Sequence, residues 1–93
     1  MGKLTNDQVG EALKELEGWD REGNAILKTF GFEWFTPAMG FVVKVGLLAE
    51  RNDHHPDIDI RYKTVRIRLS MHDSGGLTDR DINLAREIEL YAL

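Results

Sequence analysis

The alternation of apolar and polar side chains over residues 57–72 constrains the fold more than any other feature of the sequence. From Asp57 to Tyr62, isoleucines and a tyrosine alternate with charged residues. From Val65 to His72, apolar residues alternate with arginines, a serine and a histidine. Successive side chains of a strand point to opposite faces, so this period of two predicts two half-buried strands. Lys63-Thr64 would connect them, although the Asn-Gly type of hairpin signal is missing.

A helix that is apolar on two sides precedes these strands. We expect Thr36 as its N-cap, Pro37 in its first position and its end near Arg51-Asn52. The stripe expected to face the core repeats at helical spacing and consists of Ala38, Phe41, Val42, Val45, Leu48 and Ala49. A second apolar row lies on another side and consists of Met39, Val43 and Leu47. This row requires a partner, either another helix or another subunit, and we favour a subunit interface.

Two further helices and a second pair of strands complete the predicted order. A capping box of Thr5 and Gln8 begins a first helix that is expected to stop at Gly18, and Thr78 with Asp81 caps the last helix. A short strand from Trp19, a turn over residues 21–24 and a strand over residues 25–32 lie between the first two helices. The order helix-strand-strand-helix-strand-strand-helix predicts a single α+β domain over residues 1–93. Its four-stranded antiparallel sheet would carry three helices on one face.

The composition argues against several classes of protein. The chain has no cysteine, so it has no disulfide, thiolate metal site or cysteine nucleophile, which suits a reducing cytoplasm. Its net charge of −4 argues against general binding of nucleic acid or of an anionic membrane, because both need a basic footprint. No apolar run approaches the roughly 20 residues that span a bilayer, and the N-terminus lacks the apolar region of a signal peptide. We therefore expect a cytoplasmic protein.

The chain has three histidines, and they lie in two short segments, residues 53–56 and 70–73. His54 and His55 follow the predicted end of the second helix, and His72 lies at the end of the last strand, on its polar side. Histidine ordinarily exchanges a proton near neutral pH, so the clustering suggests one acid–base site. Pro56 biases His55 towards an extended backbone, which can hold a ring in place. Three solvated surface histidines are an equally good interpretation of the clustering alone.

Nearby carboxylates could support these histidines or serve another purpose. Glu50, four residues before His54, either backs the histidine pair or is an ordinary exposed helix residue. Asp73 could orient His72, whereas Asp81 has a sufficient role in the cap of the last helix. A metal site is disfavoured, because adjacent histidines in an extended segment point in opposite directions and no helical His-x-x-x-His pair is present.

One long motif joins these residues. It runs Glu50-x-x-x-His54-His55-Pro56 and then Ser70-Met71-His72-Asp73-x-Gly75-Gly76-Leu77-Thr78-x-x-Asp81. The motif resembles the signature of the pterin-4a-carbinolamine dehydratases, and the resemblance covers nearly the whole chain. It implies an α+β fold, a homodimer or homotetramer, and no metal or organic cofactor. It also implies loss of water from 4a-hydroxytetrahydropterin to give quinonoid dihydropterin, which recycles the pterin used by aromatic amino acid hydroxylases.

The resemblance implies roles for the histidines and for the residues around them. His54 and His72 match the acid–base pair of the family, and His55 matches its binding and orienting histidine. Glu50 and Asp81 match positions near the site. The residues that would line the pterin pocket are Asp53, Pro56, Ser70, Met71 and Asp73.

Two positions depart from the pattern of the family. Asp53 stands where asparagine is common, and Met71 stands where threonine is common. Neither change removes a proposed acid or base, although a hydroxyl contact is lost at Met71 if that threonine acts through its side chain.

Some relatives act instead as protein-binding partners, as a dimerisation cofactor of a transcription factor or as assembly factors. A non-catalytic role of this kind, which would use the helix surfaces, is the alternative function.

Overall fold

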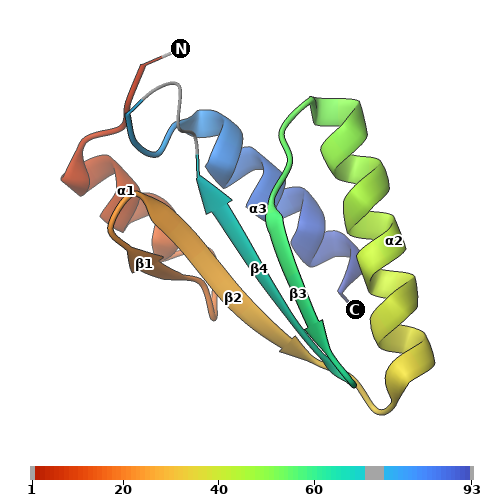
Figure 1. Ribbon diagram of the computed structural model, residues 1–93. Helices are drawn as coiled ribbons and strands as arrows, with labels where there is room; N and C mark the ends of the chain where they lie inside the picture. Colours follow the sequence, from red (N-terminus) through yellow and green to blue (C-terminus); the bar gives the residue numbers. More distant parts are fainter. Residues whose placement is uncertain (1, 71–74, 93) are drawn as a thin grey trace.

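The computed structural model describes residues 2–70 and 75–92 and contains three helices and four strands (Figure 1). In chain order the elements are α1 (Asn6–Leu13), β1 (Asp20–Glu22), β2 (Ala25–Gly31), α2 (Phe35–Asn52), β3 (Asp57–Arg61), β4 (Thr64–Ser70) and α3 (Asp79–Tyr91). The strands form one antiparallel sheet in the order β1-β2-β4-β3, and the helices pack against one face of it. The predicted element order and α+β class are confirmed.

Strand β4 lies inside the sheet and carries the apolar residues that the alternation predicted. Val65, Ile67 and Leu69 are fully buried, while the intervening side chains point to the other face and are partly or fully exposed. The register places Ile67 opposite Ile58 of β3, so apolar side chains meet across the sheet on its helix-covered face. The predicted core stripe of α2 covers this face, and all its members except the half-buried Val42 are buried.

Strand β2 has a lysine on its helix-facing side, among apolar residues. Lys28 is paired with Ile67 of β4 in the sheet register. Its Nζ lies 2.5 Å from Oε1 of Glu89 on α3, and the same oxygen accepts a hydrogen bond of 2.7 Å from Nε1 of Trp19. The charge of Lys28 is therefore neutralised by the carboxylate of Glu89, and this contact links the C-terminal end of α3 to the sheet.

Several predicted boundaries were wrong. The first hairpin turn is Gly23-Asn24 and not residues 21–24, because β1 continues to Glu22, and β2 ends at Gly31 and not at residue 32. Helix α1 ends at Leu13 and not at Gly18, because the chain tightens into turns in which Glu15 and Leu16 donate to carbonyls three residues back. Helix α2 begins at Phe35 with Trp34 as N-cap, so Thr36 is not the cap. Pro37 is then the third helical residue, where a missing N–H costs no bond because the first four N–H groups have no partner inside the helix.

Another error concerns the connection between β3 and β4. Tyr62 lies in the turn with Lys63 and not in the strand, because Arg61 and Thr64 are register partners. Its φ of 53° lies in the left-handed region, which is uncommon for a residue other than glycine. A two-residue hairpin turn requires such a conformation, and the sequence lacks the asparagine or glycine that usually signals it.

Replacement of Ile67 by alanine tests the assignment of the core. We expect Ile67→Ala to lower the free energy of unfolding by about 2–5 kcal/mol, because it opens a cavity under the helices. The adjacent Arg66→Ala lies on the exposed face and should change it by no more than about 0.5 kcal/mol. Urea denaturation followed by tryptophan fluorescence measures both, and equal losses in the two variants would contradict the predicted orientation of β4.

Candidate active site

The end of α2 turns the chain sharply and sets the direction of the histidine pair. Asp53 follows the helix in the left-handed conformation, with φ 48° and ψ 45°. Its N–H donates to the carbonyl of Glu50 at 3.2 Å, and the N–H of His54 donates to the carbonyl of Ala49 at 3.1 Å. These two bonds form a Schellman motif, which ends a helix and satisfies its last carbonyls. Aspartate tolerates the left-handed conformation better than most residues do, so the sequence suits this turn.

His54 is folded back into the protein and bound to α3. Its Nε2 lies 2.6 Å from Oδ1 of Asp81, and the side chains are only 5% and 0% exposed respectively. The other carboxylate oxygen of Asp81, Oδ2, accepts a hydrogen bond of 2.9 Å from the N–H of Thr78. A carboxylate only accepts hydrogen bonds, so the partner assigns the hydrogen to Nε2 of His54. This tautomer leaves Nδ1 with a free electron pair that can take a proton.

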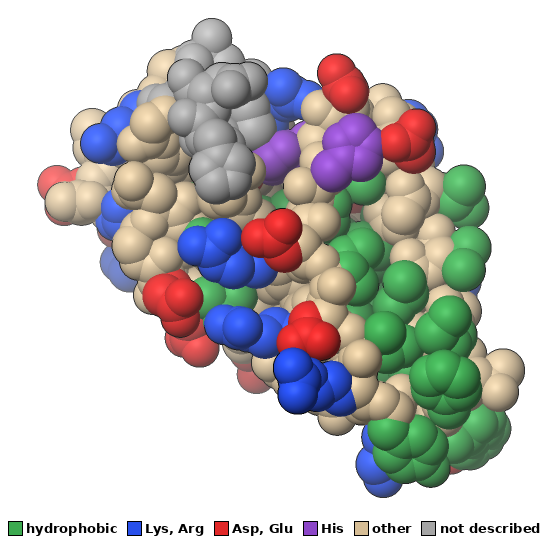
Figure 2. Space-filling model, in the orientation of Figure 1, with side chains coloured by type: hydrophobic (Ala, Val, Ile, Leu, Met, Phe, Trp, Pro, Cys, Tyr) green, Lys and Arg blue, Asp and Glu red, His purple; other side chains and the backbone are tan. Residues whose placement is uncertain are grey.

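His55 lies on the opposite side of the chain and faces solvent. Its Nε2 lies 2.5 Å from Oε1 of Glu50, and the side chains are 57% and 77% exposed. An exposed pair of this kind contributes little stability, because water screens the charges and the side chains lose freedom. The contact therefore orients an accessible imidazole more than it holds the fold together. Figure 2 shows the histidine side chains near the end of α2, beside acidic side chains.

The described part of the candidate site combines two chain segments. Glu50, Asp53, His54, His55 and Pro56 lie within one segment, residues 50–56, and Asp81 joins them from the first turn of α3. Thr78 and Asp81 form the predicted capping box, and Asp81 also binds His54, so the cap is not the only contact of this residue.

Ser70, the last residue of β4, lies at the same end of the sheet. The register pairs Asp57 of β3 with Arg68 of β4, so the start of β3 and the end of β4 are neighbours. Ser70 itself pairs with Ala25 of β2. The predicted site residues Met71, His72 and Asp73 lie outside the described residues.

Arg80 is a residue of this region that the sequence did not suggest. Its Nη2 donates to the carbonyls of Asn52 at 2.7 Å and Asp53 at 2.6 Å, so it crosses from α3 to the end of α2. One signal was available: a cation in the first turn of a helix opposes the helix dipole and so calls for a separate explanation.

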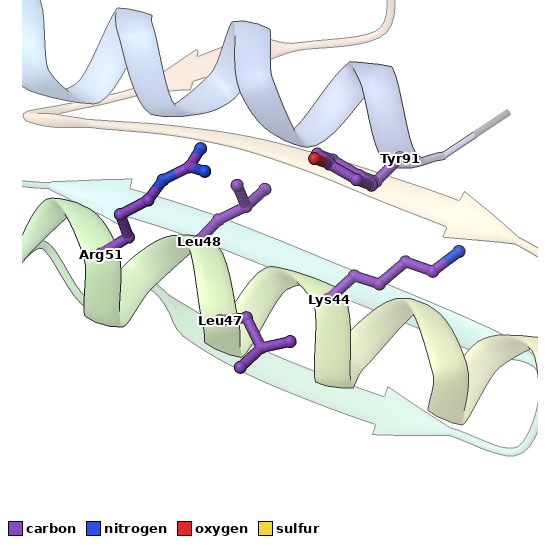
Figure 3. Close-up of a pocket in the computed structure, with 5 residues that line it drawn as sticks. All are labelled: Lys44, Leu47, Leu48, Arg51 and Tyr91. Carbon is purple, nitrogen blue, oxygen red and sulfur yellow. The ribbon is translucent and has the colours of Figure 1, made fainter.

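A separate hollow lies between α2 and α3 and contains none of the predicted site residues. Its volume is about 280 Å³, and it is lined by Lys44, Leu47, Leu48, Arg51 and Tyr91. Figure 3 shows the aromatic ring of Tyr91 in the space between α3 and α2, with Leu48 pointing towards α3 and Leu47 pointing away from it. Arg51 is already paired with Glu87 of α3 at 2.9 Å. The hollow is therefore a feature of the helix surface and not of the histidine site.

No helix among residues 2–70 and 75–92 has the length and apolar character needed to cross a membrane. In the same residues, no group of three or more potential metal-ligating side chains is placed to hold an ion.

Replacement of Asp81 measures its double role. We expect Asp81→Ala to lower the free energy of unfolding by about 2–3 kcal/mol, because it leaves a buried imidazole N–H and the Thr78 N–H without acceptors. Asp79→Ala removes a neighbouring exposed carboxylate from the same helix turn and should cost only about 0.5 kcal/mol, as expected for a contact with the helix dipole. Chemical denaturation of both variants checks this, and a small loss in Asp81→Ala would show that its bond to His54 does not stabilise the protein.

Comparison with known proteins agrees with the motif. Residues 2–91 match the family model described as pterin 4 alpha carbinolamine dehydratase. A protein of Roseiflexus castenholzii, provisionally named pterin-4-alpha-carbinolamine dehydratase, is 51% identical over 90 residues, which cover 96% of this chain and 97% of the relative. A protein of Thermomicrobium roseum with the same provisional name is 46% identical over 88 residues, which cover 95% of each chain.

Two solved structures share the fold. A Brucella melitensis protein described as a transcriptional coactivator/pterin dehydratase superposes with a TM-score of 0.95 at 36% identity, and the match covers 99% of this chain and 100% of the other. A pterin dehydratase-like protein identified as a RuBisCO assembly factor superposes with a TM-score of 0.68 at 20% identity, over 80% and 86% of the two chains, and so shows the fold alone. The family model and the close relatives, taken with the fold, establish that this chain belongs to the pterin 4 alpha carbinolamine dehydratase family.

Proposed function

We propose that this protein catalyses the dehydration of 4a-hydroxytetrahydropterin to quinonoid dihydropterin and water, and so recycles a pterin cofactor. Family membership over residues 2–91 supports the reaction class. The observation that carries the proposal is the contact between His54 and Asp81, because a buried carboxylate that fixes the tautomer of a histidine is an arrangement suited to proton transfer.

The reaction needs two proton transfers and no redox step. The bond between C4a and its hydroxyl oxygen breaks, and the N5–H bond breaks as its electron pair forms the new C=N bond. Hydroxide is a poor leaving group near neutral pH, so a general acid must protonate the departing oxygen while a general base removes the N5 proton. Each positioned acid or base contributes on the order of 10²–10⁴-fold to the rate.

We assign the acid–base pair to His54 and His72, and the binding role to His55. His54 has its Nε2 engaged by Asp81, so Nδ1 is the atom that would exchange a proton with the substrate. His72, which the structure does not describe, is assigned from the motif alone. His55 is more accessible and is oriented by Glu50, which suits contact with the pterin ring.

The residues that would line the pterin pocket are Asp53, Pro56, Ser70, Met71 and Asp73. In this proposal the histidines carry the chemistry with neither a metal nor an organic cofactor. We further propose a cytoplasmic location, which the absence of cysteine from the chain supports.

An assay of 4a-hydroxytetrahydropterin dehydration tests the function and separates the roles of the histidines. Wild-type protein should accelerate the reaction. His54→Ala and His72→Ala should each lower kcat by about 10²–10⁴-fold, whereas His55→Ala should mainly raise KM. Asp59→Ala, which alters an exposed residue of β3, should behave as wild type. A dehydration rate with wild-type protein that is no higher than the rate in buffer alone would refute the proposal.

The exposed side of α2 supports a second proposal, that the protein is a homo-oligomer. Phe35, Met39, Val43 and Leu47 recur every four residues and are all exposed, with Val43 and Leu47 at 59% and 67%. Figure 2 shows hydrophobic side chains gathered along this helix. Gly46 lies on the same side, and an added Cβ there meets no atom within 4 Å, which leaves room for another backbone.

We propose that a second copy of the chain covers this row, in a dimer or a tetramer. Residues spaced by four form a ridge that packs into the equivalent groove of another helix. Two copies of the same row are both uncharged and can pair about a twofold axis, as in most homodimers. A domain of this length buries a relatively small fraction of its surface, so burial of the row between two copies would also add to its stability.

Sedimentation velocity tests the oligomer. Wild-type protein at tens of micromolar should sediment with a mass at least twice that of one chain, and Val43→Glu should shift it towards the monomer because it buries an unpaired charge. Lys44→Glu changes the charge of the next residue, which lies on another side of the helix, and should leave the mass unchanged. A wild-type monomer at this concentration would refute the proposal.

The alternative function is a non-catalytic protein-binding or assembly role that uses the same helix surface. A variant with all three histidines replaced by alanine separates the two functions. It should keep its oligomeric state and lose dehydratase activity if the enzyme proposal is correct. If the wild-type protein shows no dehydratase activity but still forms the oligomer, the binding role is favoured.

A further inference from the structure

A single guanidinium nitrogen of Arg80 joins the start of α3 to the end of α2. Its Nη2 donates to the carbonyl oxygens of Asn52 and Asp53, at 2.7 and 2.6 Å. These carbonyls belong to the last residue of α2 and to the residue that follows it, directly before the histidine pair. Figure 1 shows the first turn of α3 close to the upper end of α2, at the same end of the molecule. Arg80 therefore holds the backbone from which His54 and His55 project.

The electrostatics explain why an arginine serves here. The last carbonyls of a helix have no partner inside it and carry partial negative charge, so a cation beside them is favoured. The same cation is disfavoured in the first turn of its own helix. Arg80 occupies such a position in α3, and the end of α2 supplies the compensating negative charge.

The turn that Arg80 holds would otherwise be easy to distort. Asp53 has a positive φ, and a residue other than glycine adopts this conformation at a cost. The two hydrogen bonds of the Schellman motif fix the N–H groups of this turn, and Arg80 fixes its carbonyl groups. The loop backbone is thus restrained on both sides.

Arg80 and Asp81 act on the same loop from consecutive positions of α3. Asp81 binds the imidazole of His54, and Arg80 binds the backbone before it. We propose that Arg80 is a positioning residue for the histidine pair, which it places by holding the carbonyls of Asn52 and Asp53. This inference rests on the proposed dehydratase function, because it assumes that the position of the histidines governs the rate.

Kinetics of Arg80→Ala test the proposal. A displacement of the reacting groups by about 1 Å costs on the order of 10²-fold in rate, so we expect kcat to fall by about 10–100-fold, with a smaller change in KM. Arg80→Met keeps most of the side-chain stem without its donors, and it replaces Arg80→Ala if that variant does not fold. The matched control is Arg51→Ala, which breaks another arginine contact between α2 and α3, to Glu87, without touching the loop. Its kcat should equal that of wild type.

Nitrogen-15 NMR of the imidazoles supplies a second readout that does not need activity. In wild type and Arg51→Ala, the spectrum should show a His54 tautomer with hydrogen on Nε2. In Arg80→Ala this signal should shift or broaden towards that of a mobile histidine. A folded Arg80→Ala or Arg80→Met variant with wild-type kcat and an unchanged His54 signal overturns the proposal. If wild type has no dehydratase activity, the proposed function fails, and the NMR comparison alone decides whether Arg80 positions the histidines.

Discussion

The carboxylate of Asp81 is the group on which the organisation of the candidate site depends. One oxygen closes the cap of α3 through the N–H of Thr78, and the other binds the imidazole of His54. A buried carboxylate is costly unless hydrogen bonds satisfy both of its oxygens, and these two contacts do so. The same contacts join the beginning of α3 to the loop that follows α2. One side chain therefore both caps the N-terminus of α3 and orients the imidazole of His54.

The sheet provides the platform on which this contact can form. Strand β4 is apolar on one face only, so α2 and α3 must both lie on that face. The two helices then run side by side, and the end of one meets the beginning of the other beyond the same end of the sheet. Arg80 adds charge complementarity at this junction. The requirement to bury one face of a hairpin thus brings together residues that are 27 positions apart, His54 and Asp81.

Much of the fold could be predicted from local patterns. The strands of residues 57–70 follow from alternation, and the core stripe of α2 follows from helical spacing, because each depends only on which face of an element is apolar. The capping boxes of α1 and α3 were also predicted, since their hydrogen bonds join residues three apart. The errors include positions where a local signal misled or was missing: Gly18 does not end α1, Thr36 does not cap α2, and Tyr62 lies in a turn.

The site could be predicted in part. The clustering of the histidines and the long motif identified the segments around them, and the motif identified the family. Neither indicated that His54 is buried and His55 exposed, nor that each is bound to a different carboxylate. Arg80 was not predicted at all, because its partners are backbone carbonyls. Every residue has a backbone carbonyl, so the sequence does not indicate which ones an arginine will bind.

The sequence by itself determined the element order, the apolar faces and the residue types of the site, because spacing along the chain is sufficient to define them. Only the tertiary structure decided how those residues are paired. Asp81 and Arg80 reach the end of α2 because the two helices must cover the same face of the sheet, and this proximity depends on packing between distant segments. The division into a buried histidine and an exposed one likewise arises from the left-handed turn at Asp53 meeting α3, and neither segment alone produces it.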